Sequence, residues 1–191
     1  AKNTAVGSLT LDANTTGVEN VAIGEQALTT NTTASYNTSV GGESMKANTT
    51  GAQNSALGQR ALFANTTGDY NAAVGLSSLG HNTTGSNNAA VGYLALYENT
   101  TGTENVAVGV EALQANTTGG SNIAVGRISL SSNTTGGSNV AVGWNSLFAN
   151  TTAANNTAVG DNAMAANTTG QKNVAVGALS LDKNTTGNDN T

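Results

Sequence analysis

The hydrophobic and polar positions of this chain recur every 17 residues from one end to the other. The unit reads N-x-A-V-G-x-x-[AS]-L-x-x-N-T-T-G-x-x, and eleven full units fill residues 3–189. The third and eighth positions are small, the fourth is Val, Ile or Leu, and the ninth is Leu or Met. A fixed period of this kind predicts a stack of similar units, each in contact only with its neighbours.

Within one unit the pattern favours short strands joined by tight corners. Only six residues separate the Gly of the fifth position from the Asn of the twelfth, which is too few for a packed helix, and Asn-Thr-Thr-Gly is a poor helix former. We expect one strand at Asn-x-Ala-Val-Gly and a second around the eighth and ninth positions. Gly at the fifth and fifteenth positions is expected to supply the positive φ angles of the corners. The chain is therefore predicted to be all-β, a parallel β-solenoid (β-roll) of eleven 17-residue coils forming one domain over residues 1–191.

The core predicted for one coil is thin. The third, fourth, eighth and ninth positions would bury about one Val and one Leu beside two small residues, whereas 17 backbone residues must be ordered. We therefore expect a second buried face in a homo-oligomer, a trimer around a long axis, with a single-chain solenoid as the alternative. The second position as a whole is too apolar for a free surface and is the candidate for that face, with Thr4, Val21, Thr38, Ala72, Val106, Ile123 and Val140.

Asn is invariant at the first and twelfth positions. A corner Asn can bond both local backbone and the same Asn of the next coil, and such amide ladders satisfy backbone groups that would otherwise be buried and unpaired. The first predicted ladder comprises Asn3, Asn20, Asn37, Asn54, Asn71, Asn88, Asn105, Asn122, Asn139, Asn156 and Asn173. The second comprises Asn14, Asn31, Asn48, Asn65, Asn82, Asn99, Asn116, Asn133, Asn150, Asn167 and Asn184.

Composition and charge narrow the expected partners. Charged residues make up 9% of the chain, and only six are Lys or Arg against eleven Asp or Glu, for a net charge of −5. A nucleic-acid partner is therefore not expected. No apolar run approaches the roughly 20 residues that span a bilayer, so membrane insertion is not expected either.

At Asn20–Gly24 the chain reads Asn-Val-Ala-Ile-Gly, and Asn-Val-Ala-Val-Gly starts at Asn105, Asn139 and Asn173. These segments resemble the head repeat of trimeric autotransporter adhesins of the YadA type, and repeats in phage tail fibres. The resemblance covers the whole chain and implies a left-handed, trimeric parallel β-roll that binds host-surface components. The present unit is longer than the adhesin unit and carries an extra Asn-Thr-Thr-Gly corner, as in some tail-fibre repeats.

Asn-Thr-Thr permits two further interpretations. It matches the acceptor pattern for N-glycosylation at every twelfth-position Asn. Its threonines also permit an ice-binding hypothesis, but neighbouring residues such as Thr15 and Thr16 point to opposite sides of extended backbone, so that at most one column faces outward.

Aromatic side chains fall at variable positions of the unit. Exposed rings can stack on glycans or on a partner protein. Tyr93 with Tyr97, and Trp144 with Phe148, are the candidate surface-binding pairs, and ordinary tolerance of aromatic residues on the exterior is the alternative.

Catalytic and metal-binding motifs find little support in the sequence. His81 is the only His, there is no Cys, and the acidic residues do not recur at one phase of the repeat. No Ser-His-Asp set, His/Cys metal cluster or calcium ladder is indicated, so we expect neither an enzyme nor a cofactor.

The pattern as a whole predicts a structural or adhesive segment of an extracellular fibre, on a cell or virion surface. Its partners would be copies of itself and possible host-surface glycans or proteins. A self-assembling filament subunit and an ice-binding solenoid are the alternatives. Neither end shows an atypical capping unit, so we expect either an excerpt of a longer fibre or ends that stack on other subunits. An end-to-end joint would skip most of a unit, which favours the excerpt.

Overall fold

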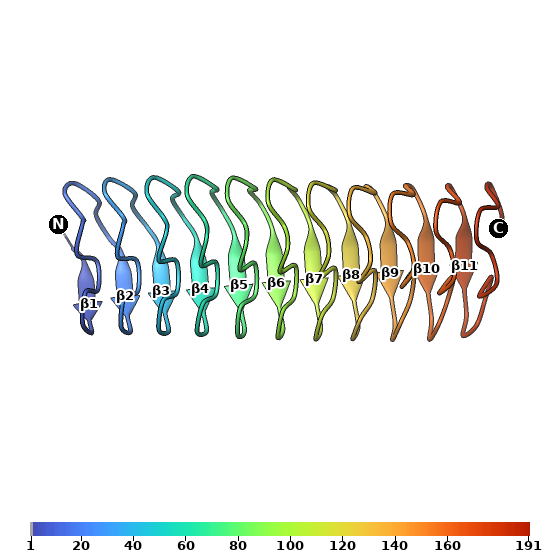
Figure 1. The fold of residues 1–191 in the computed structure, drawn as a ribbon, viewed down its shortest axis with the longest axis horizontal. Coiled ribbons are helices and arrows are strands. Elements are labelled where there is room, and N and C mark those ends of the chain that lie inside the picture. The colour runs from blue at the N-terminus through green and yellow to red at the C-terminus, as the bar shows by residue number, and fades with distance from the viewer. Residues whose placement is uncertain (1) are drawn as a thin grey trace.

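The structure is a computed structural model that describes residues 2–191, and it shows a single stack of coils (Figure 1). Each coil contributes one three-residue strand to a parallel sheet of eleven strands, in the order of the chain. Across residues 2–191 there is no helix long and apolar enough to cross a membrane. The strands are β1 (Thr4–Val6), β2 (Val21–Ile23), β3 (Thr38–Val40), β4 (Ser55–Leu57), β5 (Ala72–Val74), β6 (Ala89–Val91), β7 (Val106–Val108), β8 (Ile123–Val125), β9 (Val140–Val142), β10 (Thr157–Val159) and β11 (Val174–Val176).

The 17-residue period sets the register of the sheet. Every strand pairs with the next at equivalent positions, as in Thr4 with Val21 and Ala5 with Ala22. The predicted all-β, parallel β-solenoid is thereby confirmed. Since neighbouring strands in a sheet lie about 4.8 Å apart, eleven coils give a rod about 50 Å long.

The core is a narrow column inside the coils. Ala of the third position, the small residue of the eighth and Leu or Met of the ninth are buried in the interior coils, as shown by Ala90, Ala95 and Leu96 at 0% exposure. The predicted inward orientation of the fourth position is wrong. Successive side chains of a strand point to opposite faces, so the buried Ala90 directs Val91 outward, where it is 42% exposed.

The predicted second strand is also absent from the part of the chain that the structure describes. The segment from the sixth to the eleventh position forms consecutive turns. Its seventh and ninth residues have positive φ, for example 53° at Leu94 and 55° at Leu96. A strand requires strongly negative φ, so this alternation curls the segment while its amides still bond the next coil, as in Leu96 N–H to Ala112 O (2.9 Å).

The two conserved glycine positions have different roles. The fifth-position Gly has positive φ in every coil, 140° at Gly92. A Cβ at Gly92 would also lie 2.4 Å from Gly109 O in the next coil. The prediction of positive φ for the fifteenth position is wrong. Gly102 does not have positive φ, and the fourth positive-φ residue of each coil, after the fifth, seventh and ninth, is the seventeenth, such as Glu104 at 60°.

Candidate functional site

Both Asn series lie inside the coils, and their amides form continuous ladders. From Asn20 to Asn173 and from Asn31 to Asn167, every one of these residues is buried. At the twelfth position, the Asn99 amide donates to Asn82 Oδ1 (2.7 Å) and to Gly102 O (3.0 Å). Each side chain therefore joins its own corner to the preceding coil.

The first-position Asn closes the same corner from the strand side. Asn88 Nδ2 donates to Gly102 O (2.9 Å), which also accepts from Asn99 Nδ2. The Asn88 oxygen accepts from the backbone N–H of Asn105 (3.0 Å). Throughout residues 2–191, no buried side-chain N or O atom is left without a hydrogen-bond partner. The ladder amides thus offer no free group to a ligand, and a glycan attached to a twelfth-position Asn in the folded rod would replace a ladder hydrogen bond.

The outer face of the sheet, which we call the strand face, consists of the second and fourth positions of all coils. Its fourth positions form a continuous aliphatic strip, whereas its second positions include Thr4, Thr38, Ser55 and Thr157 beside aliphatic residues. The fourth position is Val, Ile or Leu throughout. Leu57, Val91 and Val108 are 53%, 42% and 38% exposed. The second-position residues predicted for a buried face lie on this same side, for example Val106 and Ile123, and within this single chain none of them is buried. An unbroken strip of this kind is typical of an interaction surface.

Threonine forms two columns with different environments. The thirteenth-position hydroxyls donate to the carbonyl of the same position in the next coil, as in Thr83 Oγ1 to Thr100 O (2.9 Å). The fourteenth-position threonines, such as Thr84 and Thr101, are exposed. One outward Thr column therefore runs along the rod.

The four aromatic candidates lie in the turn segment between the strand and the Asn-Thr-Thr corner, outside the strand face. Tyr93, Trp144 and Phe148 are 46%, 45% and 39% exposed, and Tyr97 is half-buried. Tyr97 stacks on His81 rather than on Tyr93, with ring centroids 4.2 Å apart and an interplanar angle of 40°. Trp144 borders a shallow groove of about 450 Å³ between the ninth and eleventh coils, with the small Ala165 in the coil between.

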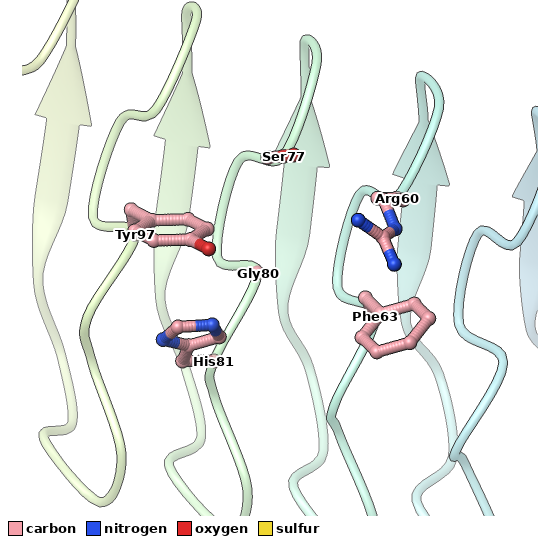
Figure 2. Close-up of a pocket in the computed structure, with 6 residues that line it drawn as sticks. All are labelled: Arg60, Phe63, Ser77, Gly80, His81 and Tyr97. Carbon is pink, nitrogen blue, oxygen red and sulfur yellow. The ribbon is translucent and has the colours of Figure 1, made fainter.

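A smaller pocket opens where the tenth position is Gly80. Figure 2 shows Phe63 and Arg60 on one side of Gly80, and Tyr97 and His81 on the other. Phe63 and Tyr97 occupy the tenth position of the coils before and after Gly80, so the missing side chain leaves a gap one coil wide. The pocket has a volume of about 90 Å³ and is lined by Arg60, Phe63, Ser77, Gly80, His81 and Tyr97.

Ion pairs and a cation–π contact fix the side chains on one side of this pocket. Glu43 pairs with both Lys46 Nζ and Arg60 Nε at 2.9 Å, and the Arg60 guanidinium lies over the Phe63 ring, 4.9 Å from its centroid. The hydrogen bond from Lys46, with smaller contributions from the charges of Lys46 and Arg60, holds the pKa of Glu43 below its ordinary value despite opposing desolvation. Arg60 is thereby fixed above the aromatic wall.

On the other side, His81 Nδ1 lies 2.8 Å from a carboxylate oxygen of Glu98 in the next coil. This contact and the stacking on Tyr97 orient the imidazole at the pocket. The sequence analysis identified only Tyr97 among the pocket residues. The sequence does carry a sign of the pocket, because Phe63, Gly80 and Tyr97 follow one another at 17-residue spacing. This spacing predicts a gap between two rings only if the coils stack in register.

No cluster of three or more His, Cys, Asp or Glu side chains that could hold a metal ion occurs within residues 2–191. Comparison with family models, with curated proteins and with solved structures finds no match to this chain.

Proposed function

We propose that this chain is a structural and adhesive segment of an extracellular fibre, in which three copies associate through their strand faces. The observation that carries the proposal is the unbroken strip of branched aliphatic residues on the outside of the sheet. The strand face, three residues wide over a 50 Å rod, covers about 500 Å². The fourth-position column is its uninterrupted apolar part, and contiguous apolar patches of a few hundred Å² are often functional. The repeat resemblance supports three copies and an extracellular location.

The two sides of the coil suit such a fibre. With the strand faces turned toward one another, the turn segment outside them, which carries the pocket, stays accessible. A stiff stack then holds its ends apart and presents each surface site in several copies, so that weak contacts add through avidity.

The test is the native mass by light scattering across a range of protein concentrations. We expect three chains for the wild type and one chain for Val91→Glu/Val108→Glu, because burying two carboxylates in an apolar interface is strongly unfavourable. Thr101→Glu/Thr118→Glu is the matched control, since it adds the same charges to the same two coils at an exposed corner. This control should remain trimeric.

Two results would contradict the proposal. A wild-type mass of one chain at all concentrations would leave the strand face without a role in assembly. Open-ended growth with concentration would identify a filament subunit instead. The ice-binding alternative requires thermal hysteresis in solution. It is less favoured, because only the fourteenth-position threonines form an outward column, whereas the thirteenth-position hydroxyls bond the next coil.

A further inference from the structure

The strand face is bordered by two columns of mostly exposed residues. The seventeenth-position residues lie two places before each strand and form what we call the leading edge, as Ser121 does for β8. The sixth-position residues lie two places after each strand and form the trailing edge, as Arg127 does. The strands run across the long axis of the rod (Figure 1), so both ends of one strand are at the same height.

Only a second copy of the chain can bring the two edges together. Ser121 and Arg127 are six residues apart, up to about 20 Å in extended backbone. In a closed ring of copies whose rods point the same way, the trailing edge of each chain meets the leading edge of the next, as in any cyclic interface. Equivalent coils then lie at one height, and a long side chain also reaches the neighbouring coil, about 4.8 Å away.

Arg127 is a cation without a carboxylate in its own chain. It is exposed, and the salt bridges found within residues 2–191 do not include it. The trailing edge directs side chains away from the coil, since a Cβ built on Gly42, at the sixth position of the third coil, meets no atom within 4 Å. Its neighbours in the column, Val110 and Trp144, are uncharged. The guanidinium donors are therefore available to a partner.

A carboxylate stands at the same height on the leading edge. Glu104 precedes β7, but the Ser121 hydroxyl donates to its Oε2 (3.1 Å). Because Ser121 precedes β8, this bond draws the carboxylate one coil along the rod, to the level of Arg127. A carboxylate accepts more than one hydrogen bond, so Glu104 can keep Ser121 and still receive a guanidinium.

We propose that Arg127 of one copy pairs with Glu104 of the next, which sets the three rods parallel and in register. This inference rests on the proposed assembly through the strand faces and names the contact that aligns it. Rods that point in opposite directions would place trailing edge against trailing edge, and Arg127 would then lie away from Glu104.

The other charges of the trailing edge mostly fit the same alignment. They are Glu25 and Asp161. Lys172 lies on the leading edge one coil beyond Asp161, within reach of a lysine side chain. Glu25 meets Glu19 at its own height and Lys2 one coil away, so the first coils add little net attraction.

Side-chain size is also complementary between the edges. Tyr36, which is 55% exposed, precedes β3 and would face Gly42 of the next chain. Trp144, which is 45% exposed, follows β9 and would face Ser138. In both layers a large side chain meets a small residue.

The first experiment reverses the charges and follows trimer dissociation by light scattering on dilution. Arg127→Glu and Glu104→Arg each create three like-charge contacts per trimer, so we expect the midpoint concentration of dissociation to rise about tenfold. The double variant Arg127→Glu/Glu104→Arg restores opposite charges and should return the midpoint toward the wild type. Lys183→Glu is the matched control, since it makes the same charge change at a residue that is 92% exposed in the turn segment. It should leave the midpoint unchanged.

The second experiment tests the register by cross-linking and does not require dissociation. The chain has no Cys, so a short bismaleimide reacts only with introduced thiols. Ser121→Cys/Arg127→Cys places them on opposite edges of β8 and should give covalent trimers on a denaturing gel. Ser121→Cys/Ala178→Cys is the control, because Ala178 follows β11, three coils or about 14 Å along the rod. It should give none.

The outcomes separate this inference from the assembly itself. A wild-type trimer that ignores both single reversals, that the double reversal does not restore, or that cross-links equally in the two Cys pairs would overturn the pairing and leave the assembly standing. A wild-type mass of one chain at every concentration would refute the assembly, and the pairing with it.

Discussion

Replacing Asn99 by Ala tests the ladder in the middle of the stack. The substitution removes two hydrogen bonds that Asn99 donates, to Asn82 Oδ1 and Gly102 O, and one that it accepts from Asn116 Nδ2. Gly102 O keeps its bond from Asn88, but Asn82 Oδ1 is left buried without a partner. Three hydrogen bonds at about 0.5–1.5 kcal/mol each, with a further penalty for the stranded oxygen, predict a loss of about 2–5 kcal/mol in the free energy of unfolding.

Urea unfolding followed by far-UV circular dichroism measures this loss. Thr101→Ala is the matched control in the same coil, because that threonine is exposed at the corner; it should change stability by less than about 0.5 kcal/mol. Asn99→Asp keeps the size but turns the donor into a second acceptor facing Asn82 Oδ1 and Gly102 O. It should cost at least as much as Ala near neutral pH. If Asn99→Ala matched the Thr101→Ala control, the ladder would not be a source of stability and the reasoning would be refuted.

Other substitutions test the corners and the pocket walls. Gly92→Ala should lower the melting temperature more than Gly102→Ala. A Cβ would lie 2.4 Å from a carbonyl oxygen of the next coil at Gly92 and 2.5 Å at Gly102, but only Gly92 also has positive φ, and Ala already occupies the equivalent of Gly102 in two coils; equal effects would contradict the corner assignment. The pKa of Glu43 is lowered from 4.5 by its partners, so this stabilising pairing is complete above pH 4.5 and is lost as the pH falls through the lower folded-state pKa. Lys46→Gln should move the NMR titration midpoint of Glu43 upward, and an unmoved midpoint would show that the pair does not form in solution. Ser39→Ala, which restores the residue of all other coils at that position, should leave the melting temperature unchanged or slightly higher, and a clear decrease would assign a structural role to the Ser39 hydroxyl.

The repeat itself made much of this fold predictable. An invariant period places equivalent residues side by side, so the parallel register of Ala90 with Ala107 follows from the spacing alone. The hydrogen-bonding needs of a buried corner similarly suggested that invariant Asn would serve as amide ladders. These inferences depend only on what every coil shares.

The backbone path between the corners was less accessible to sequence reasoning. Leu96 adopts a φ of 55°, although left-handed backbone normally disfavours residues other than Gly, Asn and Asp. The coil imposes this φ angle because it buries Leu96 in the core. The local conformational preference of Leu therefore could not have predicted it. The expectation of a second strand failed for this reason. The assignment of Val91 to the core failed for another reason, since successive side chains of a strand point to opposite faces and Ala90 takes the inner one.

The pocket is formed by residues that differ from coil to coil. A consensus of the repeat omits such residues, so it does not reveal the pocket. Gly80, Phe63 and Tyr97 each occupy a variable position, and they become one site only through stacking at 17 and 34 residues. His81 lacked any catalytic companion in the sequence, and its contact with Tyr97 depends on the close approach of neighbouring coils.

The identical register of every strand pair also bears on how such a rod can change over generations. Recombination between two coils at equivalent positions adds or deletes 17 residues and recreates the same junction. Each event alters the reach of the rod by about 4.8 Å. A deletion that is not a multiple of 17 residues interrupts both amide ladders at the coil that carries it. Length is therefore inherited in whole coils, and a lineage can tune the length of the rod by duplication within the gene, with no new contact between coils to evolve.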